Sequence, residues 1–94
     1  MSKTSKLFTA KWTDNPEHLH HLKDIKDGEI RGIVAGNPST SQETLHHLKN
    51  DKHSWVRQAV AINSNVSHKI LHHLKDDEDA DVRREVELHP NLKK

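Results

Sequence analysis

The side chains with the richest chemistry in this sequence are paired histidines. Ten of the 94 residues are histidines, and a Leu-His-His-Leu-Lys pentapeptide occurs three times at 26-residue intervals. Imidazole titrates near pH ~6.5 and binds metals, so such pairs can form a metal site or a surface that gains charge in mild acid. On a helix whose leucines face the core, paired histidines fall on opposite flanks. We predict two polar ladders, His20/His46/His72 and His21/His47/His73.

One other pair of histidines has the spacing of a metal site. His68 and His72 stand four residues apart, so one helix face could offer both imidazoles to zinc. No clear third ligand accompanies them, and they are only a weak candidate. The chain has no cysteine, which excludes disulfides, thiolate metal sites and iron–sulfur clusters and fits a reducing compartment. We expect no metal and no cofactor.

An arginine follows each pentapeptide at a fixed distance. We predict that these side chains bond the acidic turn between two helices or the carbonyl groups of the next repeat, which makes a structural ladder of Arg31, Arg57 and Arg83. The alternative is a row that meets phosphates, formed by these arginines with Lys23, Lys49 and Lys75. The formal net charge of +1, with 14 acidic residues, weighs against this alternative. So does the lack of interleaved basic and aromatic residues.

Trp55 is the departure from the repeat that best indicates a binding site. The equivalent positions in the other repeats are Glu29 and Asp81, so Trp55 should face solvent or the edge of a groove. An exposed tryptophan on the central repeat is a candidate hot spot. The alternative is that its ring packs over neighbouring lysine and histidine side chains. We expect Trp12 to cover the N-terminal end of the core. The candidate binding residues are Trp55, Arg57, Lys49 and His46.

The elements that position these side chains are predicted by the 26-residue interval. Only 31% of the residues are apolar, too few for a large globular core, but they are periodic. Stacked repeats bury the faces that one repeat cannot bury alone. We therefore predict one repeat domain over residues 1–94. Its parts are a degenerate N-terminal cap at 1–10, repeats at 11–36, 37–62 and 63–88, and a tail at 89–94.

Each repeat should contain two helices. The first begins at a capping box, with Asp14 and Thr40 as the predicted caps and Asn65 or Ser67 as the cap in the third repeat. Its leucines, three residues apart, should face the core. The second helix has apolar residues at helical spacing over about nine residues and is ended by a following proline in the first and third repeats.

The ends of the stack differ from its middle. Leu7 and Phe8 stand one repeat length before core positions of the first repeat, so the N-terminal residues should form a half-repeat that closes one end. Glu85 and Glu87 replace two alanines of the second repeat, as expected for a solvent-facing cap at the other end. An incompletely covered end exposes apolar surface, so self-association is an expected possibility.

The repeat resembles the motif of the leucine-rich repeat variant family. Val-Arg-Gln-Ala-Val-Ala-Ile-Asn at 56–63 and Val-Ala-Gly-Asn-Pro at 34–38 are similar to that family's Val-Arg-x-x-Val-Ala-x-Asn-Pro, although Ser64 replaces the proline in one repeat. Over residues 14–91 the resemblance implies a right-handed solenoid of α and short α or 3₁₀ helices, with no activity. HEAT-like helical pairs are the structural alternative. Some relatives carry an iron–sulfur cysteine cluster, which has no counterpart here.

The predicted fold is therefore all-α: a right-handed α-solenoid, or superhelix, of about three two-helix repeats of 26 residues. The sequence shows no nucleophile, oxyanion hole or phosphate loop, so we predict that the protein is not an enzyme. We expect a module for protein–protein interaction, with binding of nucleic acid or another polyanion through the arginine, lysine and histidine ladders as the alternative. No apolar run suggests a signal peptide or reaches the ~18–20 residues of a membrane span, so we expect a cytoplasmic protein without a membrane partner.

Overall fold

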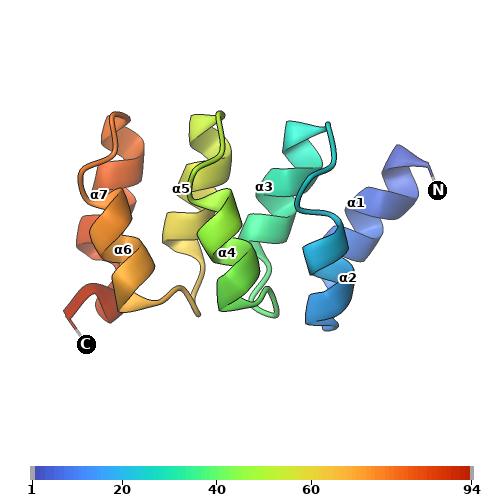
Figure 1. The fold of residues 1–94 in the computed structure, drawn as a ribbon, viewed down its shortest axis with the longest axis horizontal. Helices are drawn as coiled ribbons and strands as arrows, with labels where there is room; N and C mark the ends of the chain where they lie inside the picture. Colours follow the sequence, from blue (N-terminus) through green and yellow to red (C-terminus); the bar gives the residue numbers. More distant parts are fainter. Residues whose placement is uncertain (1, 94) are drawn as a thin grey trace.

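The protein is helical throughout the part of the chain that the structure describes, residues 2–93 (Figure 1). In that range the computed structural model contains seven α-helices, one 3₁₀ helix and no strand. The elements are α1 (Lys3–Trp12), α2 (Pro16–His21), α3 (Gly28–Gly36), α4 (Gln42–Leu48), α5 (Ser54–Ile62), α6 (His68–Leu74), α7 (Ala80–Leu88) and the 3₁₀ helix η1 (Pro90–Lys93). The all-α prediction is confirmed.

The helices alternate between two layers along the longest axis of the molecule (Figure 1). The longer helices α1, α3, α5 and α7 form one layer, and the shorter helices α2, α4 and α6 form the other. Packing within the long-helix layer runs from α1 to α3, from α3 to α5 and from α5 to α7, and η1 packs on α6. The result is a row of helix pairs with extents of 38, 23 and 17 Å.

The core lies between the two layers and follows the predicted periodicity. Five of the six pentapeptide leucines are fully buried, and the sixth, Leu22, packs partly against the core. The fully buried set includes Leu19, Leu45, Leu48, Leu71 and Leu74 from the short helices, and Val34, Val56, Val60, Val82 and Val86 from the long helices. Helices of six to ten residues are unstable alone in water. Burial of these side chains, at roughly 1.5–3 kcal/mol each, is what holds the helices together.

The short helices begin at caps that recur once in each repeat. The side chains of Asn15, Ser41 and Ser67 accept hydrogen bonds from backbone N–H groups two or three residues ahead. The prediction of Ser67 is confirmed, whereas the predicted caps Asp14 and Thr40 are wrong by one residue. In the first repeat, a proline at the first helical position places the cap directly before it. In the second, the Thr40 hydroxyl instead donates to a carbonyl in the last turn of α3, at 2.5 Å.

Successive long helices are joined at their C-terminal ends by a repeated side-chain clamp. Asn63 Nδ2 donates to the Ala35 carbonyl at 2.8 Å, and its Oδ1 accepts from a backbone N–H two residues ahead at 2.8 Å. Asn37 binds the end of α1 in the same way. His89 replaces asparagine in the third repeat: its Nε2 bonds the Asn63 carbonyl at 2.7 Å and its Nδ1 accepts from the Asn91 N–H at 3.0 Å. Since a carbonyl only accepts and a backbone N–H only donates, these two bonds require the tautomer with its proton on Nε2.

The first helix departs from the register of the other long helices. The C-caps of α3, α5 and α7 are separated by one full repeat length, but the C-cap of α1, Thr13, precedes that of α3, Asn37, by only 24 positions. The linker between α1 and α2 is therefore two residues shorter than its counterparts, and α1 continues past the predicted cap boundary at residue 10. Leu7 is only partly buried, Phe8 is 67% exposed, and Ala10 is the residue of α1 that enters the core. The predicted core position of Phe8 is wrong for this reason.

Candidate interaction surface

Arg31 and Arg57 form a ladder between successive helix pairs. Arg31 Nε donates to Asp51 Oδ2 of the next turn at 2.7 Å, and its Nη1 donates to the Ile25 carbonyl at 2.7 Å. Arg57 repeats the arrangement with Asp77 Oδ2 at 2.8 Å and the Asp51 carbonyl at 2.7 Å. The four side chains are 10% exposed or less. The predicted structural ladder is confirmed for Arg31 and Arg57 but not for Arg83, with the correction that the carbonyl groups belong to the arginine's own repeat.

The electrostatics of this ladder favour the charged forms. Burial by itself raises the pKa of Asp51 and Asp77, but hydrogen bonds from the arginines and from backbone N–H groups outweigh it, so both pKa values lie below the usual carboxyl value. The hydrogen bonds to these carboxylates raise the pKa of Arg31 and Arg57. Arg57, a candidate binding residue, thus has its guanidinium engaged inside the protein and is 9% exposed.

Arg83 occupies the same position on the last helix but is exposed. It donates to the Asp77 carbonyl of its own turn at 2.6 Å. No helix pair follows α7 within residues 2–93, so Arg83 meets no turn of a following repeat there. Only half of the interaction that Arg31 and Arg57 make is therefore present at this end of the row.

The paired histidines lie on opposite flanks of the short helices, but these flanks do not form two separate outward ladders. His20 Nδ1 lies 2.8 Å from the Thr44 hydroxyl of the next short helix. His47 Nε2 lies 2.8 Å from Asp24 Oδ1 of the preceding turn. The short helices stand side by side, so a flank of one short helix meets the opposite flank of the next. The prediction of two continuous ladders is wrong for that geometric reason.

His46 and Lys49, two candidate binding residues, bond each other at the C-terminal end of α4. His46 Nδ1 lies 3.1 Å from Lys49 Nζ. Burial lowers the pKa of His46, and the nearby positive charges of Lys49, Lys69 and His73 lower it further. A neutral imidazole can accept a hydrogen bond from the ammonium group, which agrees with this lowered pKa.

The weak metal candidate, His68 and His72, is a stacked pair of rings. Their centroids are 4.3 Å apart and the ring planes differ by 28°. The in-plane lone pairs of stacked imidazoles point side by side and do not converge on one ion. Between residues 2 and 93, no group of three or more histidine, cysteine or acidic side chains is arranged to hold a metal ion.

Trp55 combines the two predicted environments. It is 53% exposed, and its ring stacks on His53 with centroids 4.1 Å apart and planes within 11°. The Cδ1 edge of the ring approaches Gly32 on α3. A groove of about 430 Å³ beside it is lined by Lys52, His53, Ser54, Trp55, Arg57, Glu78 and Asp79. The structure thus brings Trp55 and Arg57 together in one groove, which His46 and Lys49 do not line.

Further apolar side chains extend from Trp55 along the long-helix layer. Trp55, Ala59 and Ile62 stand at i, i+4 and i+7 of α5 and so share one helix face. Ile62 is 54% exposed and lines a hollow of about 280 Å³ together with Leu88 of α7, which is 71% exposed. Sequence reasoning missed Ile62 and Leu88 as surface residues. The signal that could have found them is their spacing: Ile62 is two turns after Trp55, and Leu88 is the equivalent of Ile62 in the next repeat.

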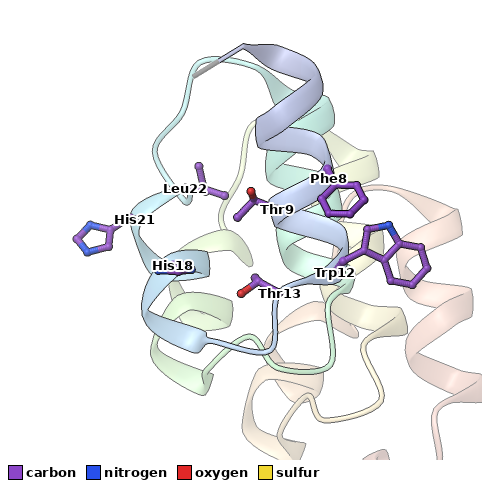
Figure 2. A pocket seen from close by; sticks show the side chains of 7 residues that line it. All are labelled: Phe8, Thr9, Trp12, Thr13, His18, His21 and Leu22. Carbon is purple, nitrogen blue, oxygen red and sulfur yellow. The ribbon is translucent and has the colours of Figure 1, made fainter.

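A second groove opens at the N-terminal end of the row, between α1 and α2 (Figure 2). It measures about 510 Å³ and is lined by Phe8, Thr9, Trp12, Thr13, His18, His21 and Leu22. Trp12 is 66% exposed, so the expectation that it covers the core is wrong. The shifted register makes Trp12 the last residue of α1, at the position that Ile62 and Leu88 hold in their helices, and Lys11 Nζ lies 5.5 Å from its ring centroid.

Comparisons with known proteins give no guide to function, so the proposal below rests on the geometry described above. No family model, curated protein or solved structure matches the chain. Within the described residues, no helix has both the length and the apolar character needed to cross a membrane.

Proposed function

We propose that the protein is a non-enzymatic helical-repeat module that binds another protein through the face of α5 around Trp55. The observation that supports this best is the half-exposed indole on the central long helix, continued by exposed Ile62 and by Leu88 of the next long helix. Tryptophan is enriched among the residues that dominate binding energies, and contiguous exposed apolar side chains are typical of interaction surfaces.

The proposal includes the architecture and setting that the sequence suggests. The row of helix pairs would be a right-handed α-solenoid similar to the leucine-rich repeat variant family, placed in the cytoplasm. Three features that recur at the same positions of successive repeats support a regular stack: the short-helix caps, the clamps at Asn37 and Asn63, and the ladder of Arg31 and Arg57. The absence of cysteine supports a reducing compartment.

The decisive variant is Trp55→Glu, with Trp12→Glu as the matched control. Both tryptophans are more than half exposed, so neither change should alter the helical circular dichroism. We would capture the partner from the native host with wild-type protein and measure its affinity for each variant by calorimetry. Loss of a hot-spot side chain costs about 2 kcal/mol, so Trp55→Glu should bind about 30-fold more weakly.

Two results of that experiment would contradict the proposal. One is equal affinity of the Trp55→Glu variant and wild type. The other is loss of affinity in the Trp12→Glu control, which would place the partner at the N-terminal groove instead.

The alternative, binding of nucleic acid or another polyanion, has less support from the geometry. It relies on a row of arginines, yet the guanidinium groups of Arg31 and Arg57 bond carboxylates inside the protein. A labelled single-stranded oligonucleotide distinguishes the two proposals by fluorescence anisotropy. The interaction module predicts no binding tighter than about 10⁻⁴ M at physiological salt, whereas the alternative predicts affinity that rises from pH 7.5 to 5.5 and falls steeply with salt.

A further inference from the structure

The face of α5 around Trp55 continues along its boundary with α7, the next helix of the long-helix layer (Figure 1). Trp55 and Ile62 stand seven residues apart on α5, which separates them by about 10 Å along the helix axis. The groove beside Trp55 and the hollow beside Ile62 and Leu88 both include residues of α7 or of the turn that precedes it. The boundary therefore offers two apolar anchor points, two helical turns apart.

Acidic side chains line both of these depressions. Glu78 and Asp79 belong to the groove beside Trp55, and the side chain of Glu78 is 88% exposed. Glu85 is the acidic residue of the hollow beside Ile62. A partner that covered the apolar side chains would therefore meet a carboxylate at each anchor point.

Acidic residues also flank Trp55 on the neighbouring long helices. Trp55 stands eight positions before the C-cap of its helix, and Glu29 and Asp81 stand at the same position of α3 and α7. Their side chains are 61% and 63% exposed. The repeat thus places a carboxylate on each side of the indole, within the same layer.

Basic side chains near this face are fewer than the acidic ones. Lys3 and Arg84 pair with the two flanking carboxylates, at 3.2 and 3.7 Å, and Lys52 lines the groove beside the indole. The guanidinium of Arg57 bonds its buried ladder carboxylate and has one nitrogen 3.6 Å from Glu78.

The segment that forms α7 and the turn before it is strongly acidic even so. Residues 76–88 carry seven acidic and two basic side chains, in a chain whose formal net charge is +1. The side of the row that contains Trp55, Ile62 and Leu88 therefore borders on an excess of negative charge.

We propose that the partner segment that binds this face is a basic amphipathic helix. Its apolar side chains would cover Trp55 and Ile62, and its lysine or arginine side chains would meet Glu78 and Glu85. The inference rests on the proposed function and adds the chemistry of the partner. Charge complementarity favours a basic segment over an acidic one, which would place like charges opposite each other. Residues seven apart on the partner helix match the spacing of the two anchor points, as in other complexes of an amphipathic helix with a groove.

The test uses the Trp12→Phe variant, in which Trp55 is the only tryptophan and its fluorescence emission reports this face. The probe is an amidated peptide of about 18 residues with leucines on one helix face and lysines on the other. A matched peptide carries glutamate in place of lysine. We expect the lysine peptide to shift the Trp55 emission to shorter wavelength. Its affinity should be at least about tenfold higher than that of the glutamate peptide and should fall at high salt.

A double charge reversal tests the role of the carboxylates. Glu78→Lys combined with Glu85→Lys should weaken binding of the lysine peptide at least about fivefold. Glu17→Lys combined with Glu43→Lys is the control, because it makes the same change in net charge at exposed positions of the short helices. The control should bind the peptide within about twofold of the starting protein, since charges far from the contact are screened by salt. Circular dichroism and urea titration verify that each variant is folded.

Three outcomes would overturn the inference. Equal or tighter binding of the glutamate peptide would show that the face does not select positive charge. A lysine peptide that leaves the Trp55 emission unchanged would exclude a basic helix at this face. Equal losses of affinity in the two double variants would show that only the overall charge of the protein attracts the peptide.

The captured partner separates this inference from the proposed function. If that partner loses affinity in Trp55→Glu but not in the variant with Glu78→Lys and Glu85→Lys, the proposed function stands and the basic character of the partner is refuted. If Trp55→Glu leaves the affinity unchanged, the proposed function itself fails.

Discussion

At the scale of single residues, the buried ion pairs are the interactions on which the stack depends most. Each guanidinium joins two inter-helix turns: Arg57 bonds the Asp51 carbonyl in its own turn and the Asp77 carboxylate in the next. Asp77 also accepts from the Asp79 N–H at 2.9 Å, so the same carboxylate shapes the turn before α7. Removing one partner would leave a buried charge without compensation, which is costly in a protein interior.

We predict that Asp77→Ala lowers the free energy of unfolding by about 3 kcal/mol. The neighbouring change Asp76→Ala is the control, because Asp76 is exposed and should shift stability by less than about 0.5 kcal/mol. Urea titration followed by helical circular dichroism measures both values. Equal stability of the two variants would show that the ion pair contributes nothing beyond a surface carboxylate.

At the scale of elements, the C-terminal clamp explains how the long helices keep a constant offset. Asn63 and His89 make equivalent bonds, one to the end of the preceding long helix and one to the N–H two residues ahead. In asparagine the side-chain Nδ2 donates one bond and Oδ1 accepts the other. In histidine a protonated Nε2 donates and an unprotonated Nδ1 accepts. Two different residue types thus perform one structural role.

This equivalence predicts that His89→Asn is tolerated and His89→Ala is not. The asparagine variant should unfold within about 0.5 kcal/mol of wild type, since both bonds can be remade. The alanine variant leaves the Asn63 carbonyl without this partner and should lose about 1–3 kcal/mol. Urea titration of both variants at neutral pH provides the measurement. If asparagine were as damaging as alanine, the shape of the imidazole rather than its hydrogen bonds would be what the site requires.

The elements also show what the sequence could and could not predict. The number of helix pairs, the inward leucines and the arginine ladder follow from a period that recurs three times. The register shift of α1 does not follow from this period, because a linker that is two residues shorter changes neither the composition nor the spacing of the apolar residues. That shift moves Phe8 and Trp12 to the surface. Asp14 could not be separated from Asn15 as a cap, because both residue types cap helices well.

The sequence likewise predicts one part of the candidate site and not the rest. The exposure of Trp55 was predictable from the acidic residues at the equivalent positions of the other repeats. Its extension to Ile62 and Leu88 was not, because an apolar residue in a nine-residue helix is assigned to the core until the packing of its neighbours is known. The groove between α1 and α2 likewise depends on the position of α1, which only the structure provides.

At the scale of the whole molecule, polar contacts between neighbouring helix pairs make stability depend on pH. The groups with lowered pKa values include the ladder carboxylates Asp51 and Asp77, and His46, whose pKa is lowered by burial and by positive charges that include Lys69 and His73 of the next short helix. A lowered pKa means that the folded protein binds a proton less readily than the unfolded chain does. Each group therefore supports folding at neutral pH, and this support is lost as the pH falls from the unfolded pKa through the folded pKa.

The signs of the shifts predict two successive losses of stability in acid. The free energy of unfolding should first fall below pH ~6.5, where unfolded histidine gains its proton but the partly buried His46 resists it. It should fall again below pH ~4, as Asp51 and Asp77 lose the charge that holds Arg31 and Arg57. Urea titrations at about pH 7.5, 5 and 3 measure the two steps.

Two variants assign these steps to their groups. His46→Gln keeps a polar side chain without the titration and should reduce the first step, while Asp77→Asn should reduce the second. Stability that stays constant down to pH ~4 would contradict the role given to His46. A second step of unchanged size in Asp77→Asn would mean that carboxylates outside the ladder control acid unfolding. Because every ladder pair joins two neighbouring repeats and helices of six to ten residues are unstable alone, we expect the helices to melt as the helix pairs separate in acid.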